Sequence, residues 1–286
     1  MERHVYERMA EIDRDHWWFV GRRRIIAALI ERFRPKPGPL AILEVGCGTG
    51  SNVALLQQFG TVDAVEPDDE ARAFAAGRTG LPIKGGYLPD GVALEDARYD
   101  LIVLLDVLEH IPDDRGALAG LVAKLAPGGR LLLTVPAMPS LWSGHDVAHH
   151  HQRRYTPRAL EKVVRDAGFR PIHRGAFNSL LLPAVVAVRL VNKLAGRKGG
   201  DDDALPPRPV NRLLATLFGA ERYFAARGWL PLGVSLALVA QPAGVVGSPG
   251  PGGTTRQRMP RSPPVQIGTR PGKLFHRWRG ISISQT

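Results

Sequence analysis

A strongly apolar segment that runs into three alternating glycines is the feature that most constrains how this chain folds. Residues 41–45 read Ala-Ile-Leu-Glu-Val, and Gly46, Gly48 and Gly50 follow at once. Glycine admits positive φ and lets a ligand approach the backbone closely. A helix predicted after Gly50 would offer free N–H groups and the positive end of its dipole at the same place. The segment therefore predicts a buried strand, a ligand-binding loop and a helix.

The rest of the chain alternates apolar strands with helices, which is typical of an α/β fold. Such strands indicate a doubly wound, mostly parallel sheet with helices on both faces. The seven predicted strands are 41–45, 61–66, 81–85, 99–105, 130–135, 169–177 and 234–240, and the helices among them are 51–59, 68–76, 113–125 and 156–167. Two N-terminal helices are predicted within 5–34, on either side of residues 16–19, and a mostly helical insertion at 180–228 precedes the last strand.

The glycine spacing distinguishes two kinds of cofactor. A dinucleotide fingerprint requires G-x-G-x-x-G, but its last position is Ser51 when counted from Gly46 and Val53 when counted from Gly48. The pattern that fits is acidic-x-G-x-G-x-G, beginning at Glu44. It resembles the glycine-rich loop of class I S-adenosylmethionine methyltransferases. That cofactor is cationic at sulfur and has no pyrophosphate, so an acidic neighbour suits it.

Three further segments resemble motifs of the same family, in the same order. Glu66 ends the second predicted strand, where an acid can accept both ribose hydroxyls. Residues 106–110 (Asp-Val-Leu-Glu-His) follow the fourth strand, and residues 125–130 (Leu-Ala-Pro-Gly-Gly-Arg) lead into the fifth. The resemblance covers residues 40–177 and the last strand. It implies a seven-stranded sheet with an antiparallel last strand, and S-adenosylmethionine across the ends of the first, second and fourth strands.

The resemblance also implies which residues bind this cofactor. Gly46, Gly48 and Gly50 would line the methionine and ribose, Glu66 would hold the ribose, and Asp106 would lie near the methionine or the substrate. The predicted cofactor site is Glu44, Gly46, Cys47, Gly48, Gly50, Glu66, Pro67, Asp106 and Val107. No acid directly follows the third strand, so adenine recognition is left open.

Several of these residues have structural alternatives. Glu44 could serve as the partner of a backbone amide. Asp106 could be a helix cap with no role in binding. Cys47 could be a small packed residue beside the loop; as the one cysteine of the chain, it excludes a disulfide framework.

Histidines gather in the loops after the fourth and fifth strands, where ligands bind in open α/β sheets. In one reading, His145 or His151 is a general base that takes the proton of an acceptor hydroxyl, and Asp146 orients it. This reading gives the predicted catalytic residues His145, Asp146 and His151, with no metal site assigned.

Two other readings of the same segment stay open. His145 and His149 are four residues apart and could bind a metal ion, although helix content is doubtful after Gly144. Alternatively, the cluster is structural, or it binds an anionic substrate together with Arg153 and Arg154, because arginine pairs suit phosphate.

The segments at either end of the predicted core are interpreted as substrate-binding additions. His16–Phe19 with Arg22–Arg24, together with residues 141–146 and 153–156, resembles a bacterial methyltransferase subgroup associated with cell-envelope glycans or lipid-linked intermediates. The apolar stretch in 180–198 predicts a cap that docks a lipid tail or makes peripheral membrane contact. A buried cap helix or a dimer face is the alternative.

Charge is concentrated in the C-terminal tail. Residues 245–286 hold seven Lys or Arg and no Asp or Glu, so they account for +7 of the net charge of +11. Proline and glycine make up 13 of these 42 residues, which predicts a disordered tail. The positive net charge of the chain is therefore only weak support for nucleic-acid binding by its folded part. The start of the chain has no apolar signal segment, and a cytoplasmic location, with membrane association as an option, is expected.

The predicted domain organisation is an N-terminal helical lid (1–39), a cofactor-binding core (40–177), a helical cap (178–230), the last core strand (231–243) and a basic tail (244–286). The predicted function is S-adenosylmethionine-dependent methyl transfer to a small-molecule or lipid-linked glycan acceptor, at oxygen. An RNA or protein methyltransferase, a nicotinamide-dependent oxidoreductase and a non-catalytic cofactor-binding module are the alternatives.

Overall fold

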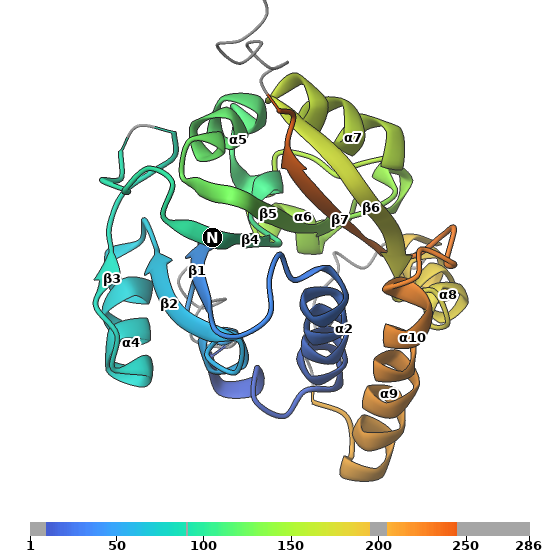
Figure 1. Cartoon of the computed structure of the whole chain (residues 1–286). Helices are drawn as coiled ribbons and strands as arrows, with labels where there is room; N and C mark the ends of the chain where they lie inside the picture. The colour runs from blue at the N-terminus through green and yellow to red at the C-terminus, as the bar shows by residue number, and fades with distance from the viewer. Residues whose placement is uncertain (1–9, 90, 195–204, 245–286) are drawn as a thin grey trace, which may run out of the picture. The chain divides into compact units, whose positions relative to one another are not determined.

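One seven-stranded sheet organises the chain (Figure 1). This computed structural model describes residues 10–89, 91–194 and 205–244. The strands are β1 (Leu40–Val45), β2 (Gly60–Val65), β3 (Ile83–Lys84), β4 (Tyr99–Leu105), β5 (Leu125–Pro136), β6 (Phe169–Phe177) and β7 (Ser235–Pro242). Their order is β3-β2-β1-β4-β5-β7-β6, and β7 runs antiparallel to both neighbours. The predicted mostly parallel sheet with an antiparallel last strand is confirmed.

Helices cover both faces of the sheet, as the continuous apolar strands predict. The helices are α2 (Trp17–Phe33), α3 (Val53–Leu56), α4 (Asp69–Thr79), η1 (Leu108–His110), α5 (Asp114–Val122), η2 (Pro139–Leu141), α6 (Gly144–Ala148), α7 (Pro157–Asp166), α8 (Leu182–Leu194), α9 (Arg208–Ala220) and α10 (Arg222–Ala225). Side chains of α5 and α7 pack on one face, and side chains of α2, α3, α9 and α10 pack on the other. The two apolar clusters thus lie on opposite faces of the sheet. Figure 1 shows the helices on both sides of it.

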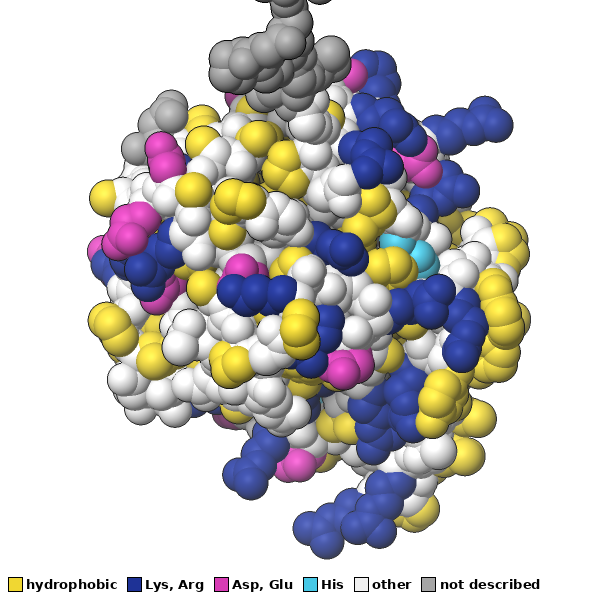
Figure 2. Space-filling model, viewed as in Figure 1, with side chains coloured by type: hydrophobic (Ala, Val, Ile, Leu, Met, Phe, Trp, Pro, Cys, Tyr) yellow, Lys and Arg dark blue, Asp and Glu magenta, His cyan; other side chains and the backbone are white. Residues whose placement is uncertain are grey.

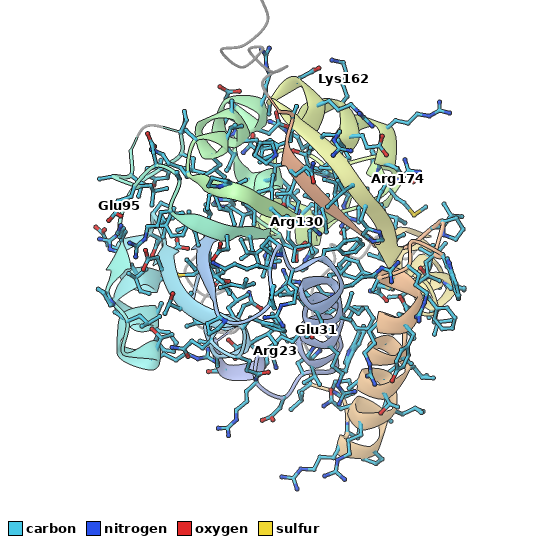
Figure 3. All side chains as sticks on the ribbon, viewed as in Figure 1. Arg23, Glu31, Glu95, Arg130, Lys162 and Arg174 are labelled. Atoms are coloured by element: carbon cyan, nitrogen blue, oxygen red, sulfur yellow. The ribbon has the colours of Figure 1, made fainter. Side chains whose placement is uncertain are left out.

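Helix α2 is part of the core. Its side chains Ile25, Ile26 and Leu29 are fully buried against the sheet. At its C-terminal end, Arg130 of β5 donates to the carbonyl of Phe33 over 2.8 Å (Figure 3). The aromatic residues 17–19 open this helix, so the prediction that they connect two helices is wrong. The physical reason is the N-cap: the His16 side chain accepts the N–H of residue 18, which starts the helix there.

Several predicted elements are shorter or longer than expected, for local reasons. Only Val53–Leu56 of the helix predicted at 51–59 is α-helical, because the chain must turn into β2 at Gly60. Strand β3 is limited to two residues, between a proline and two glycines. Strand β5 begins at Leu125, so the predicted turn at 127–129 lies within its bounds, at a register shift opposite Tyr99.

The helical insertion packs against α2. The ring of Phe218 on α9 fills the space over Gly21, where any Cβ would clash with that ring. On α9, Phe218 is fully buried, whereas Val210, Leu213 and Leu217 are exposed. Within the described residues, no helix is both long and apolar enough to cross a membrane. The predicted tail beyond Gly244 lies outside the described residues.

Candidate functional site

The glycine loop leaves an open space above Gly48. Gly46, Gly48 and Gly50 have φ values of +68°, +54° and +75°. A Cβ at Gly46 would lie 2.7 Å from the Val107 side chain, whereas a Cβ at Gly48 would meet no described atom within 4 Å. Gly46 is therefore required for packing against the loop after β4. Gly48 offers a bare backbone to a ligand.

Glu66 closes this loop from the end of β2. Its carboxylate is almost fully buried and accepts the N–H of Gly48 over 2.7 Å and the N–H of Asp68 over 3.0 Å. Burial raises the pKa of Glu66, and the two backbone hydrogen bonds act in the opposite direction. Each carboxylate oxygen keeps a lone pair for a further donor, so the predicted ribose acid stands beside the open space at Gly48. Pro67 follows it, half-buried.

Glu44 is buried on the other side of the loop. One carboxylate oxygen accepts the side-chain amide of Asn52 over 3.1 Å, and the other has no hydrogen-bond partner among the described residues. Burial raises the pKa of Glu44 from 4.5 to about 7. The partner of Glu44 is thus a side-chain amide, whereas the structural alternative expected a backbone amide.

This buried carboxyl predicts a pH dependence of stability. Above pH 4.5 the group ionises in the unfolded chain, but in the folded chain it keeps its proton up to a pKa of about 7. The folded state then binds more protons, so the free energy of unfolding falls as pH rises from 4.5 to 7, by about 3 kcal/mol. We expect Glu44→Gln to be the more stable protein at pH 8 but not at pH 4.5, in urea unfolding without cofactor. Parallel pH profiles of the two proteins would contradict this.

Arg22 joins α2 to the residue after β4, to β5 and to the N-cap residue of α3. Its guanidinium lies 2.5 Å from Asp106 in an ion pair, 3.3 Å from the hydroxyl of Thr134 and 3.4 Å from the side chain of Asn52. Sequence reasoning placed Arg22 only in a basic lid; its spacing from the buried Ile25 and Ile26 is the signal that it faces inward. Arg22 thus fixes Asp106, which was predicted to lie near the methionine.

The described part of the predicted lid touches the glycine loop. Asp13 is fully buried and pairs with Arg78 of α4 through contacts of 2.6 and 2.9 Å. It also accepts the hydroxyl of Thr49 over 3.4 Å. Cys47 is buried there, and burial raises the pKa of its thiol, which fits the packing alternative.

Asp146 is the centre of the loop after β5. Helix α6 begins at Gly144 with a capping box between Ser143 and Asp146, so a helix does form where the sequence left helix content in doubt. The buried carboxylate of Asp146 lies 2.9 Å from Nδ1 of His151 and accepts Nε of Arg154 over 2.6 Å. Burial acts to raise its pKa, but these hydrogen bonds outweigh burial and hold the pKa of Asp146 well below its usual range.

The structure brings Asp146 to His151 and places His145 beside His149. The His145 and His149 rings have centroids 4.1 Å apart and are tilted by 33°, and the centroid of the His145 ring lies 6.3 Å from that of His151. Burial, followed by the charge of His145, lowers the pKa of His149 to about 3. The two candidate bases are His145 and His151, and the 2.9 Å contact shows Asp146 orienting His151.

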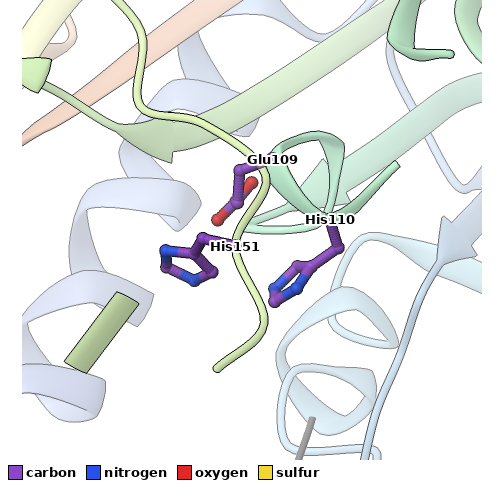
Figure 4. A group of neighbouring side chains, drawn as sticks. All are labelled: Glu109, His110 and His151. Carbon is purple, nitrogen blue, oxygen red and sulfur yellow. The ribbon is translucent and has the colours of Figure 1, made fainter. Parts of the chain in front are cut away.

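A group that sequence reasoning missed lies next to His151. Glu109 and His110 of η1 approach it, so that one ligand atom from each of the three lies within 4.8 Å of the others (Figure 4). Burial, and then the neighbouring Asp106, raise the pKa of Glu109; burial lowers the pKa of His110 to about 4. The adjacent Glu109 and His110 are a signal of a polar site in the sequence, but only the fold shows that His151 lies beside them.

The two arginines of the anion-binding reading are engaged within the protein. Arg154 is buried and donates to Asp146 and to the carbonyl of Ala137, over 2.6 and 3.0 Å. Arg153 pairs with Asp114 over 2.7 Å and donates to a backbone carbonyl. The structure thus gives both guanidinium groups a structural role.

Comparison with known proteins places the chain in a family. Residues 19–174 match the model of a family described as a methyltransferase domain. Trans-aconitate 2-methyltransferase of Variovorax paradoxus is 33% identical over 105 residues, which are 36% of this chain and 40% of that protein. A probable S-adenosylmethionine-dependent methyltransferase of Mycobacterium tuberculosis is 27% identical over 163 residues, 56% of this chain and 58% of its own length. This chain therefore spans about half the length of these curated relatives.

A solved structure shares the fold. A chain from the complex of the Haloferax volcanii Trm112 methyltransferase activator with a methyltransferase superposes with a TM-score of 0.53 at 18% identity. The match covers 84% of this chain and 94% of the other. At that identity the likeness bears on the arrangement of the sheet and helices alone.

Proposed function

The chain belongs to the methyltransferase-domain family, and we propose on that premise that it transfers a methyl group from S-adenosylmethionine to an oxygen of a small-molecule or lipid-linked acceptor. The observation that carries the proposal is the open space at Gly48, beside the Glu66 carboxylate that accepts the Gly48 N–H, in a loop whose Gly46 packs against Val107 next to Asp106. The glycine spacing of this loop does not match the dinucleotide-binding pattern G-x-G-x-x-G.

The residues around this space fit the cofactor. Glu66 accepts the ribose hydroxyls, Gly48 leaves room against the backbone, and the unpartnered oxygen of Glu44 is a buried acceptor for an ammonium or sulfonium charge. When bound, S-adenosylmethionine supplies a methyl group on a positively charged sulfur. Asp106, fixed by Arg22, marks the border between cofactor and acceptor. The remaining predicted members, Cys47, Gly46, Gly50, Pro67 and Val107, shape the loop.

The acceptor is assigned to the histidine-rich loops after β4 and β5. Of the predicted catalytic residues, Asp146 orients His151 through a 2.9 Å contact, and His151 activates the acceptor oxygen together with its neighbours Glu109 and His110. His145 borders the same loop and takes no assigned step. The half-exposed Trp142 lies on this segment and offers an apolar surface to the acceptor.

A lipid-linked acceptor is supported by the surface of the insertion. Hydrophobic side chains gather over α8–α10 with Lys and Arg beside them (Figure 2). The exposed apolar residues on and near these helices are Leu180, Val188, Val191, Val210, Leu213, Leu217, Tyr223, Phe224, Trp229 and Leu232. Such a surface suits a lipid tail or the face of a membrane. This extends the proposal to an acceptor of cell-envelope type.

A transfer assay tests the assignment of the acceptor site. Labelled S-adenosylmethionine is offered with pools of carboxylates, phenols, lipid-linked glycans, RNA and protein, to the wild type and to His151→Gln. We expect label in the organic-extractable pools and a fall in rate of about 10²–10⁴-fold in the variant. The affinity for S-adenosylhomocysteine should be the same in both proteins. Label that appears in RNA or protein, or a variant that transfers at the wild-type rate, would overturn the assignment.

A further inference from the structure

We propose that Glu109, His110 and His151 bind a divalent transition-metal ion, for which Zn²⁺ is the first candidate. The three side chains come from two loops, η1 after β4 and the segment after α6, and converge on one volume (Figure 4). Two imidazoles and one carboxylate are a donor set that favours Zn²⁺, Fe²⁺ or Co²⁺ over Mg²⁺ or Ca²⁺. The set differs from the His145–His149 pair that the sequence offered as a metal site.

The buried carboxylate of Glu109 is the first independent sign of a ligand. The residue is 1% exposed, and its Oε2 has no hydrogen-bond partner among the described residues. A buried polar atom left without a partner costs free energy. An ion between Glu109 and the two imidazoles would remove that cost.

One of the two imidazoles already spends a ring nitrogen on an oxygen. Nδ1 of His151 lies 2.9 Å from a carboxylate oxygen of Asp146. With the proton on Nδ1, Nε2 of His151 is a lone-pair donor. Metal-binding histidines are usually oriented in this way, by a carboxylate or a carbonyl behind them.

The supporting groups are held firmly. Asp146 is fully buried and fixed by Arg154 over 2.6 Å and by the N–H of Ser143 over 2.8 Å. The N–H of Gln152 donates to the carbonyl of Glu109 over 2.8 Å, which ties the two loops together. The ligand atoms lie within 4.8 Å of one another. An ion with bonds of about 2.1 Å would draw them together by on the order of 1 Å.

Three protein ligands leave an open coordination position. A metal ion there would lower the pKa of a hydroxyl bound to it. With the ion bound, His151 would act on the acceptor as a metal ligand and not as the base. This role rests on the proposed function, whereas metal binding itself does not. The acceptor class it favours is a hydroxyl or carboxylate compound able to bind a metal.

Metal titration tests the proposal on the full chain, without a histidine tag and after treatment with a chelator. Zn²⁺ is titrated by calorimetry, and Co²⁺ by its visible absorption, into the wild type, His151→Gln and His110→Gln. The matched control is His173→Gln, because His173 is a partly buried histidine on β6 that bonds to the carbonyl of Ala225. Circular dichroism confirms folding, and S-adenosylhomocysteine is titrated into the same samples.

We expect one Zn²⁺ per chain in the wild type and in the His173 variant. Affinity should fall at least about 100-fold in each of the other two variants, as for loss of a first ligand. No Zn²⁺ binding by a folded wild type, or equal binding by all four proteins, would overturn the metal site. If the protein binds S-adenosylhomocysteine but no Zn²⁺, the metal site fails and the proposed function stands. If it binds Zn²⁺ but no S-adenosylhomocysteine, only the proposed function fails.

Discussion

Replacing Gly48 with alanine is expected to abolish cofactor binding and to leave the fold intact. The new Cβ would meet no described protein atom within 4 Å, so it would project into the space proposed for S-adenosylmethionine. The folded protein should lose about 1–2 kcal/mol, the cost of an alanine at positive φ. The affinity for S-adenosylhomocysteine should fall at least about 100-fold, which corresponds to roughly 2.7 kcal/mol.

Gly80→Ala is the matched control for this substitution. Gly80 caps α4 with φ +69°, and a Cβ there would likewise meet no described atom within 4 Å, but Gly80 lies outside the glycine loop. Both variants should therefore unfold at similar urea concentrations, and only Gly48→Ala should fail to bind in calorimetry. Equal affinity in the two variants would show that the space at Gly48 is not the cofactor site.

The second large effect is expected at Glu66. Alanine there removes the proposed acceptor of two ribose hydroxyls, each of which is worth about 1.5 kcal/mol when hydrogen-bonded to a charged group. The affinity for S-adenosylhomocysteine should then fall about 100-fold or more. The substitution also frees the N–H groups of Gly48 and Asp68, so some loss of stability must be separated from the loss of binding.

Glu221→Ala separates the two effects. Glu221 is likewise a buried glutamate that accepts two backbone N–H groups, those of Ser179 and Leu180, away from the glycine loop. Both variants should lose comparable stability in urea, because both leave buried N–H groups without an acceptor. Retained affinity in Glu66→Ala, or an equal loss in Glu221→Ala, would exclude Glu66 as the ribose acid.

The elements that sequence reasoning predicted well are those that depend on local pattern. The apolar run at 99–105 marks β4, and the segment predicted at 169–177 is β6, both at their observed bounds. Thr156 caps α7 with its hydroxyl, ahead of Pro157. The glycine loop and Glu66 also follow from local spacing, since a strand end and a turn fix both.

What the sequence left undetermined depends on contacts between distant segments. Arg22 meets Asp106 only because α2 packs on one face of the sheet, with its first turns near the residue that follows β4. His151 meets Glu109 because the segments that follow the neighbouring strands β4 and β5 come together. The spacing of apolar residues along the chain predicts neither of these two contacts. For the same reason, the choice of His151 over His145 as the partner of Asp146 needed the geometry of α6.

Titration with S-adenosylhomocysteine, with NAD in a parallel experiment, tests the central claim most directly. The full chain is titrated by calorimetry at neutral pH with each ligand in turn. Micromolar binding of S-adenosylhomocysteine alone is the predicted result, and it would leave the acceptor as the remaining question. Binding of NAD alone, or of neither ligand, would contradict the account, and the glycine loop would then be a structural turn or the site of a different nucleotide.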